Sequence, residues 1–205
     1  MTTVLVASRN AKKLTELRRV LDAAGVGGID VIGLDAVPEY PEEPETGATF
    51  EDNALIKAEA GARATGFACL ADDSGLEVDA LNGMPGVLSA RWSGRHGDDR
   101  ANNDLLLAQI GDVPDERRGA AFVSACALVL PSGEQTVVRG EWRGIILRGP
   151  RGANGFGYDP LFVPDDDAAQ GRSSAELSPT EKDALSHRGK ALAALVPALR
   201  ELADN

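Results

Sequence analysis

The sequence predicts an α/β fold, and three consecutive patterns near its start lead to this prediction. Residues 3–7 form a continuous apolar run with β-branched members, which is typical of a strand that is buried on both faces. Residues 11–24 then carry leucines on one helical face, and Asn10 is a good N-cap for that helix. Residues 29–34 are expected to form a second strand, and this strand, helix and strand order favours a right-handed crossover.

The middle of the chain continues the alternation of helices and strands. Residues 35–47 are acidic and contain prolines, so we expect an extended loop there. Thr49-Phe-Glu-Asp52 resembles a capping box with Asp in place of Glu or Gln, and it begins an alanine-rich helix that runs to Thr65. Residues 67–71 are expected to form a short buried strand that ends at residues 72–75.

The second half of the chain predicts a hairpin and further helices. A helix capped by Asp98 is expected over residues 98–110, and residues 119–130 and 134–147 are typical of two long strands joined by a tight turn. Ser178-Pro179-Thr180-Glu181 is a strong helix start. The last helix carries leucines on one face, and we expect Pro197 to kink or break it.

Composition restricts the possible functions. The chain has 21 Lys and Arg against 32 Asp and Glu, a net charge of −11, so it lacks the broad basic face that nucleic-acid binding needs. No stretch approaches the ~18 apolar residues of a membrane span, and the first apolar run is too short for a signal peptide. We therefore expect a cytoplasmic protein that binds neither nucleic acid nor membranes, with one domain over residues 1–205 in which two lobes share one sheet.

Cys69 and Cys126 lack C-x-x-C spacing and are expected to be buried free thiols.

The segment Ser8-Arg9-Asn10-Ala11-Lys12-Lys13 lies where the carboxyl end of a strand meets a helix N-terminus. Free backbone N–H groups and the positive end of the helix dipole make such a junction suitable for phosphate. Lysines in a first helical turn oppose that dipole, so an anionic ligand would explain them. The alternative is that both lysines are solvated surface residues.

Asp72 and Asp73 follow a buried strand, at the sheet edge where α/β proteins bind their ligands. Adjacent carboxylates repel each other, and Mg²⁺ would justify the pair because it uses one or two carboxylates plus substrate phosphates. Glu42, Glu43 and Glu45 in the acidic loop are further candidate ligands, although such charge runs are usually solvated. A turn with capping aspartates is the alternative.

Two pairs of polar residues on helices are further candidates. Asn53 and Lys57 share a helix face at i and i+4, where the lysine can reach a phosphate or remain at the surface. His187 and Arg188 lie at an expected helix break near Ser186, where they can orient a polar ring edge. The alternative for His187 is a structural role.

The glycine-rich segment 152–159 contains Phe156 and Tyr158, in a chain in which aromatic residues are only 4%. This placement suits stacking against a flat ring, because glycines let the backbone approach a ligand closely, and core packing is the alternative. Neither of the two standard phosphate-loop motifs is present in the sequence. The histidines and cysteines are also too few for a zinc site, and no nucleophile-elbow pattern occurs.

Together and in this order, these stretches resemble the inosine/xanthosine triphosphate pyrophosphatases, which hydrolyse non-canonical purine nucleoside triphosphates. The matching stretches are Ser8–Lys13, Glu45–Ala54, Ala71–Leu76, Gly155–Pro160 and Ser186–Arg188. They extend from the first strand to the final helix, so the resemblance covers essentially the whole chain. The first motif begins Ser8-Arg9-Asn10 where the family commonly has Thr-Gly-Asn, and Pro44-Glu45 stands where it often has two acids.

The resemblance implies a long twisted mixed sheet flanked by helices, two lobes with a central cleft, a homodimer, and Mg²⁺-dependent cleavage of ITP, dITP and XTP to the monophosphate and pyrophosphate. It implies Asp73 as a metal ligand and general base, and we expect Glu45 as the second ligand, with Glu42 or Glu43 as alternatives. The triphosphate would be held by Ser8, Arg9, Asn10, Ala11, Lys12 and Lys13. Other nucleotide contacts would come from Ser74, Phe156, Gly157, Tyr158, Asp159, Lys182, His187 and Arg188. Asn53 and Lys57, taken from their shared helix face, complete the predicted binding residues.

Two rival functions share these features. A pyrophosphatase for other modified nucleotides, such as pyrimidines, would keep the phosphate-binding residues and change the base pocket. A regulator would bind the triphosphate without turnover. Release of pyrophosphate distinguishes the enzymes from the regulator, and a panel of nucleotides distinguishes the two enzymes.

Overall fold

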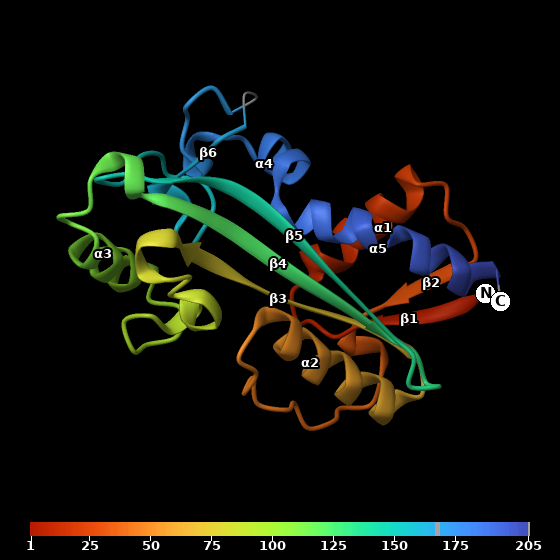
Figure 1. Ribbon diagram of the computed structural model, residues 1–205. Helices are drawn as coiled ribbons and strands as arrows, with labels where there is room; N and C mark the ends of the chain where they lie inside the picture. The colour runs from red at the N-terminus through yellow and green to blue at the C-terminus, as the bar shows by residue number, and fades with distance from the viewer. Residues whose placement is uncertain (167–168, 205) are drawn as a thin grey trace. The chain divides into compact units, whose positions relative to one another are not determined.

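The computed structural model describes residues 1–166 and 169–204, and it confirms the α/β prediction. Within these residues, six strands form one sheet in the order β2-β1-β3-β4-β5-β6 (Figure 1). The sheet is mixed, because β1 pairs in parallel with both β2 and β3, whereas β5 and β6 are antiparallel. The strands are β1 (Thr2–Val6), β2 (Ile29–Ile32), β3 (Ala68–Val78), β4 (Gly119–Val129), β5 (Gln135–Ile146) and β6 (Phe162–Pro164).

The chain divides into two compact units. The first unit contains Met1–Asp73, Ser124–Gly140 and Arg188–Asn205, and the second contains Ser74–Val123 and Glu141–His187. Strands β3, β4 and β5 therefore contribute residues to both units. In the part of the chain that the structure describes, none of the helices has the length and apolar character needed to cross a membrane.

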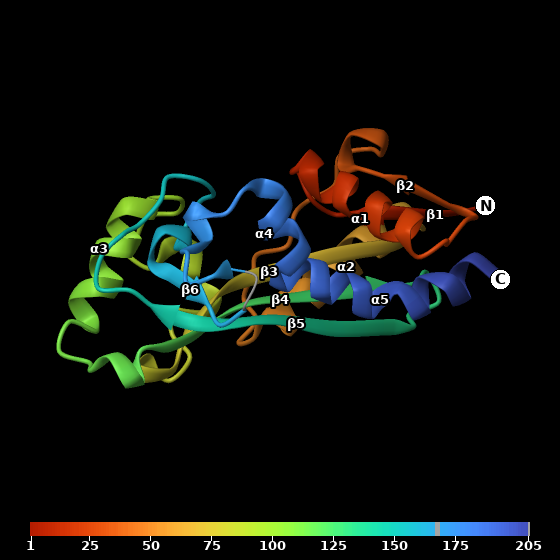
Figure 2. The same ribbon diagram turned by 90° about the horizontal axis from the view of Figure 1, so that it is seen from above.

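Three helices cover the sheet in the first unit. Helices α1 (Ala11–Ala23) and α5 (His187–Asp204) lie on one face, and α2 (Phe50–Thr65) lies on the other (Figures 1 and 2). Buried leucines of α1 and α5 pack against the sheet, and each fully buried leucine stabilises the fold by roughly 1.5–3 kcal/mol. The cluster includes Val4, Val6, Leu17, Leu21, Leu70, Leu192, Leu195 and Leu199.

Local sequence sets the helix ends of the first unit as predicted. Asn10 caps α1, because its side chain accepts a hydrogen bond from the backbone N–H of Lys12. Thr49 and Asp52 exchange side-chain and backbone hydrogen bonds in a complete capping box at the start of α2. Gly66 ends that helix with a φ of +72°, a left-handed conformation that glycine adopts without a steric penalty.

The second unit contains helices α3 (Asp99–Gln109) and α4 (Pro179–Leu185) and strand β6. Asp98 caps α3, and Ser178 forms a capping box with Glu181 at the start of α4, as the sequence predicts. The core of this unit is partly aromatic and includes Leu76, Leu106, Phe122, Trp142, Ile146, Tyr158, Leu161 and Phe162.

The prediction that the third strand ends at residue 71 is wrong. Strand β3 continues through Asp72 and Asp73 to Val78, beyond its pairing with β1, which ends at Leu70. Its other neighbour in the sheet, β4, is as long as β3 and supports the continuation. Residues 72–75 are therefore strand residues and do not form a turn at the sheet edge.

Two further predictions concern the last helix and the cysteines. Pro197 does not break α5, which continues from His187 to Asp204, since buried leucines on both sides of the exposed proline anchor the helix to the core. The expected break before this helix is present, because α4 ends at Leu185. Cys69 and Cys126 are buried free thiols, as predicted.

Candidate functional site

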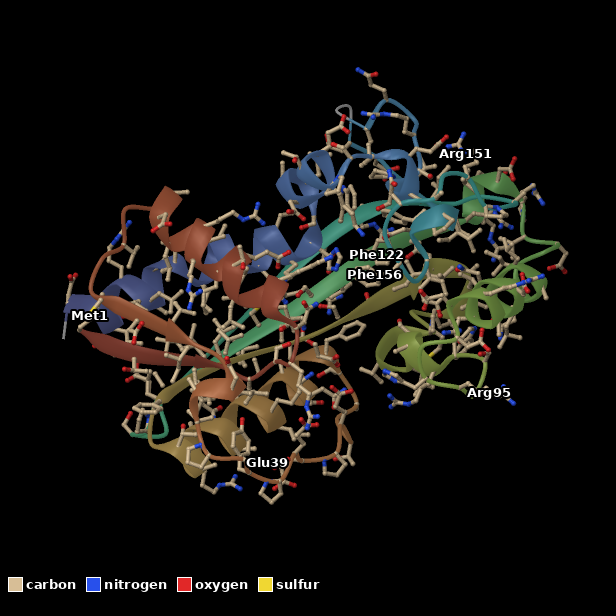
Figure 3. The ribbon with its side chains drawn as sticks, turned by 180° about the vertical axis from the view of Figure 1, so that it is seen from behind. Met1, Glu39, Arg95, Phe122, Arg151 and Phe156 are labelled. Carbon is tan, nitrogen blue, oxygen red and sulfur yellow. The ribbon has the colours of Figure 1, made fainter. Side chains whose placement is uncertain are left out.

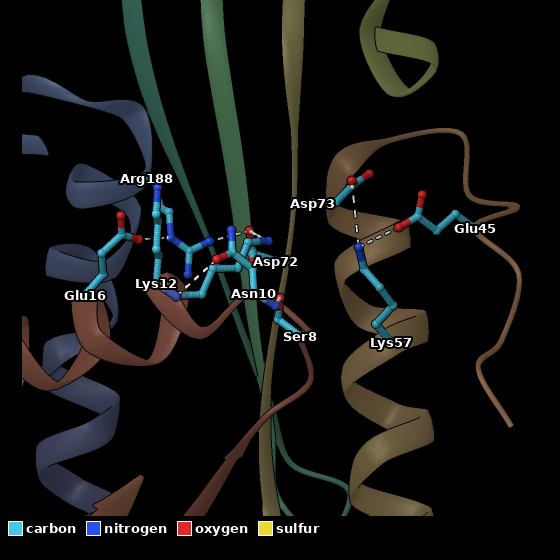
Figure 4. Close-up of polar contacts among 10 residues, drawn as sticks. Ser8, Asn10, Lys12, Glu16, Glu45, Lys57, Asp72, Asp73 and Arg188 are labelled. Carbon is cyan, nitrogen blue, oxygen red and sulfur yellow. Dashed lines mark hydrogen bonds and ion pairs between the residues drawn. The ribbon is translucent and has the colours of Figure 1, made fainter. Parts of the chain in front are cut away.

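The two aspartates of β3 point to opposite faces of the sheet (Figure 4). Successive side chains alternate in a strand, so Asp72 lies on the face that α1 and α5 cover, and Asp73 lies on the α2 face. The side chain of Asp72 is only 2% exposed, and that of Asp73 is 14% exposed. Neighbouring carboxylates at a turn would repel, but here each carboxylate has its own cationic partners.

Asp72 is held by two cations. The Lys13 ammonium donates to Asp72 Oδ2 at 2.7 Å, and Nη1 of Arg188 donates to the same oxygen. Burial alone would raise the pKa of the Asp72 carboxyl, but the charges of Lys13 and Arg188 outweigh this effect and lower the pKa below its ordinary value. Nε of Arg188 also donates to Glu16 of α1, so the network contains two cations and two carboxylates.

Asp73 is oriented by residues of α2. The amide Nδ2 of Asn53 donates to Asp73 Oδ2 at 3.0 Å, and the Lys57 ammonium lies 3.8 Å from Asp73 Oδ1. The same ammonium contacts Glu45 Oε1 at 2.7 Å, so it lies between two carboxylates (Figure 4). Asn53 is fully buried and also accepts the backbone N–H of Gly47, which fixes the segment next to Glu45.

The donor set around Lys57 fits a hard divalent cation. Two carboxylates converge on one positive group, and carboxylate oxygens are the ligands that Mg²⁺ prefers. Among the described residues, no cluster of three or more His, Cys, Asp or Glu side chains could hold a metal alone, so oxygens of a ligand would have to complete the shell. Of the acidic candidates, Glu45 contacts Lys57, whereas Glu42 contacts Arg9 at 2.8 Å.

The backbone of the Ser8–Lys13 segment is internally hydrogen-bonded. The Lys12 N–H donates to the Asn10 side chain at 3.0 Å, and the Lys13 N–H donates to the Asn10 carbonyl at 2.9 Å. Ser8 Oγ accepts the Asn10 N–H at 3.2 Å. The N–H groups of Lys12 and Lys13 are therefore already hydrogen-bonded, whereas the sequence predicted free N–H groups at this helix start.

Those side chains point in different directions. Lys12 is exposed, whereas the Lys13 ammonium is turned inward to Asp72. Arg9 is exposed and paired with Glu42. Ala11 begins α1, but its side chain lies outside the described part of the structure.

In the second unit, the buried carboxylate of Asp159 organises the glycine-rich segment. Its Oδ1 accepts the Ser174 hydroxyl at 2.9 Å, and its Oδ2 accepts both the Phe156 N–H at 2.8 Å and the Lys182 ammonium. Gly155 has a φ of +78°, and a Cβ there would lie 2.0 Å from Asp159 Oδ2, so only glycine fits. Asp159 therefore acts on the loop and on Lys182, rather than presenting a free carboxylate.

The two aromatic residues of this segment have different environments. Phe156 is 79% exposed, and the Lys182 ammonium lies 4.9 Å from the centre of its ring (Figure 3 labels Phe156). Tyr158 is buried, its hydroxyl donates to the Ser89 carbonyl at 2.8 Å, and burial raises its pKa. The core-packing alternative thus describes Tyr158, and Phe156 is the ring that a planar ligand can reach.

The remaining predicted residues of this unit are also held in place. The Gly157 N–H donates to Asp99 at 2.7 Å, and its carbonyl accepts the Asn103 amide at 2.9 Å. The His187 ring stacks on Phe122, with ring centres 5.3 Å apart and 16° between the planes. Ser74 is exposed and directly follows Asp73 in β3.

Sequence reasoning missed Glu16, which positions one of the candidate residues. Glu16 holds Arg188, and its spacing of i+3 from Lys13 on α1 is a signal that places both on one helix face. Asn53 was predicted to bind a ligand, whereas its amide is committed to Asp73 and Gly47. The partners Arg188 of Glu16 and Asp73 of Asn53 lie 172 and 20 residues away along the chain, and no local pattern in the sequence indicates them.

Comparison with known proteins gives a consistent result over the whole chain. A protein described as dITP/XTP pyrophosphatase from Nocardia farcinica is 71% identical over 204 residues, which are 100% of this chain and 98% of that relative. One of the same description from Mycobacteroides abscessus is 68% identical over 201 residues, covering 98% of this chain and 96% of the relative.

Solved structures agree with the fold. A crystal structure of a nucleoside-triphosphatase, dITP/XTP pyrophosphatase, from Mycobacterium abscessus has a TM-score of 0.83 and 68% identity, and the match covers 97% of this chain and all of that chain. The structure of the Staphylococcus aureus Ham1 protein has a TM-score of 0.86 at 38% identity, covering 98% of this chain and 100% of that one. The model of the Ham1 family matches residues 4–198. The chain therefore belongs to the Ham1 family.

Proposed function

We propose that this protein is a nucleoside triphosphate pyrophosphatase that hydrolyses dITP and XTP, and ITP as well, to the monophosphate and pyrophosphate. The observation that carries the proposal is the full-length match to relatives named dITP/XTP pyrophosphatase, one of them 71% identical. Such an enzyme removes non-canonical purines from the nucleotide pool.

The proposed reaction is an attack of water on the α-phosphorus. The water oxygen forms a bond to this phosphorus, and the bond between the phosphorus and the oxygen that bridges to the β-phosphorus breaks. Pyrophosphate leaves with the bridging oxygen, and one proton of the water is released. Negative charge develops on the phosphate oxygens during this step, and fixed cationic groups that face them lower the barrier. We assign Lys57 to this task, and we assign Lys13 to binding the phosphates equally in the ground and transition states, which lowers KM and leaves kcat unchanged.

We assign Asp73 and Glu45 as the residues that would hold Mg²⁺. When bound, the ion would neutralise phosphate charge and orient the leaving pyrophosphate. The support is that both carboxylates already face one positive group, the Lys57 ammonium. A carboxylate that binds a cation directly is a weak base, so we expect Asp73 to orient the attacking water more than to accept its proton. Asn53 supports this role, because its hydrogen bond fixes the Asp73 side chain.

For recognition of the base, we assign Phe156, His187 and Arg188. Phe156 offers an exposed ring for stacking, next to the Lys182 ammonium. Arg188 has only hydrogen-bond donors, so it can pair with the 6-oxo group of hypoxanthine or xanthine but not with the 6-amino group of adenine. Its Nε and Nη1 are used by Glu16 and Asp72, and within the described residues its Nη2 has no hydrogen-bond partner. Nη2 is the remaining donor, and because it is buried in this structure we assign it to the base only in the nucleotide-bound protein.

The test is the release of pyrophosphate from dITP, XTP, ITP, GTP and ATP, with Mg²⁺ and with excess chelator. We expect turnover of the first three nucleotides, much slower turnover of GTP and ATP, and no turnover without a divalent cation. Preference for modified pyrimidine triphosphates would favour the rival enzyme. Binding of dITP without any release of pyrophosphate would show that the protein is a regulator.

We also propose that the protein is a homodimer and acts in the cytoplasm, as the family resemblance implies. Light scattering on the purified protein would test the dimer, since a mass close to the 21.4 kDa of one chain would contradict it. Fractionation of the cells that produce the protein would test the location.

A further inference from the structure

One buried carboxylate joins three elements of the first unit. Asp72 of β3 binds Lys13 near the start of α1 and Arg188 near the start of α5, and Glu16 of α1 binds Arg188 from the other side. The Asp72 side chain is 2% exposed, that of Arg188 12% and that of Lys13 27%. Lys13 is thus the member of this trio with the most solvent-accessible side chain.

We propose that Asp72 is a positioning residue, which holds the Lys13 ammonium in place for the phosphates of the substrate and takes no part in the chemical step. This inference rests on the function proposed above and extends it to a residue that the reaction itself does not use. Asp73, its neighbour in the sequence, lies on the other face of the sheet, and it is the aspartate that we assign to the metal and to the attacking water.

The geometry around Asp72 separates it from the reacting atoms. Its Oδ2 already accepts hydrogen bonds from both Lys13 and Arg188. Its Oδ1 is buried, and among the described residues it has no hydrogen-bond partner. A carboxylate without solvent-accessible oxygens can neither receive a proton from an attacking water nor join a metal that Asp73 and Glu45 hold on the opposite face.

The effect on Lys13 follows from the chemistry of lysine. An ammonium has three N–H donors, and one of them is used by Asp72, so two remain for phosphate oxygens. A lysine side chain also loses considerable rotamer freedom when it binds a ligand, and a fixed partner removes part of that loss in advance. The negative charge of Asp72 also partly neutralises the Lys13 ammonium, and this effect alone would weaken phosphate binding. We infer that positioning is the larger effect, because the Asp72 side chain that holds Lys13 is only 2% exposed and is itself held by Arg188.

The main test compares Asp72→Asn with Asp73→Asn, two changes of equal size in adjacent residues. For Asp72→Asn we expect KM for dITP to rise about 10-fold or more, the scale of one lost hydrogen bond to a charged group, with kcat within about 3-fold. The dissociation constant of inorganic pyrophosphate should rise by a similar factor. For Asp73→Asn we expect the loss in kcat. A lower KM for Asp72→Asn would show that Asp72 weakens the charge of Lys13, and a lower kcat at constant KM would assign it to the chemical step. Either result would overturn the proposal.

A double-mutant cycle tests whether Asp72 acts through Lys13. In a Lys13→Met background, Asp72→Asn should raise the dissociation constant of pyrophosphate by no more than about 2-fold, because the residue that it positions is gone. The control cycle uses Lys57→Met, since Lys57 lies on the opposite face, binds Glu45 and affects the Asp72 carboxyl less than Lys13 and Arg188 do. In that cycle the two effects should multiply. Full multiplication in the Lys13 cycle would contradict the proposal.

Two further measurements keep the proposal testable if Asp72→Asn does not fold or if the proposed function fails. Lysine side-chain NMR of the wild-type protein should show slower hydrogen exchange for the Lys13 ammonium than for the exposed Lys12, with signals assigned from Lys13→Met and Lys12→Met. Equal exchange would overturn the proposal. Pyrophosphate binding can be measured without turnover. If the variants show the expected dissociation constants but the wild-type protein releases no pyrophosphate from dITP, the proposed function is refuted and the positioning role of Asp72 stands.

Discussion

Replacing Lys57 with methionine should change metal binding and nucleotide binding in opposite directions. The Lys57 ammonium lies 2.7 Å from Glu45 and 3.8 Å from Asp73, so a divalent cation that uses both carboxylates has to displace it. In Lys57→Met the carboxylates have lost this internal competitor, and the cation should bind more tightly.

The size of the gain follows from the exposure of the pairs. The side chains of Lys57, Glu45 and Asp73 are 23%, 38% and 14% exposed, and partly exposed ion pairs of this kind are worth about 0.2–1 kcal/mol each. Two pairs therefore predict an increase in metal affinity of roughly 2- to 30-fold. The nucleotide should bind about 10- to 150-fold more weakly, because a charge-assisted hydrogen bond to phosphate is lost.

The assay is titration with Mn²⁺ in the absence of nucleotide, followed by paramagnetic resonance, and separate measurement of KM for dITP. Arg63→Met is the matched control, since Arg63 is an exposed cation on the same helix α2 and should leave both values unchanged. Weaker or unchanged Mn²⁺ binding in Lys57→Met would refute the assignment of Glu45 and Asp73 as metal ligands.

Three further predictions follow from the same structure. Asp73→Asn should lower kcat for dITP by at least ~100-fold while thermal unfolding stays close to wild type, and near-normal turnover of the folded variant would remove Asp73 from the mechanism. Arg188→Lys should lower kcat/KM for ITP and narrow the ratio of kcat/KM for ITP to that for ATP. The ratio of kcat/KM for ITP to that for GTP should stay nearly unchanged, because guanine shares the 6-oxo group. A collapse of the GTP ratio alone would contradict the pairing of Arg188 with that group. A hydrogen bond from Arg172, and to a smaller extent those from Ser178, lower the pKa of Glu181 from 4.5 to about 2. The stabilising effect of Glu181 on α4 should therefore be complete above pH 4.5 and should decline as the pH falls from there through about 2. The difference in melting temperature between wild type and Glu181→Gln should shrink in that interval, and a constant difference down to pH 2 would show that the charge of Glu181 is not involved.

Elements whose signals are local could be predicted from the sequence. The caps at Asn10 and Thr49 depend on residues within one helical turn, so their side chains and partners are close in the sequence. The extent of β3 could not be predicted in this way. Asp72-Asp73-Ser74-Gly75 has the composition of a turn, but these residues continue β3 beside β4 in the sheet. The cations that neutralise Asp72 come from residues 13 and 188.

The candidate site shows the same division between local and distant signals. The motifs indicated which residues to examine, because a lysine, an amide and two carboxylates suggest phosphate and metal chemistry wherever they lie. They did not indicate which residues act on one another. Tyr158 and Phe156 are two residues apart, yet one is buried and the other exposed, and Asn53 is used to orient Asp73. These outcomes depend on packing between distant segments.

The alternation along β3 makes strand register a determinant of chemistry as well as of stability. Leu70 pairs with Val6 of β1 and is buried in the core, and the same face two residues later carries Asp72. Inserting or deleting one residue between Leu70 and Asp72 would exchange the faces of the two aspartates, placing Asp73 towards Lys13 and Asp72 towards Lys57. Both carboxylates would remain in the chain, but Asp72 would lose its contact with Lys13 and Asp73 would lose its contact with Lys57. In an evolving or engineered chain, the two-residue step from the buried leucine to the buried aspartate therefore cannot change without exchanging the environments of the two carboxylates.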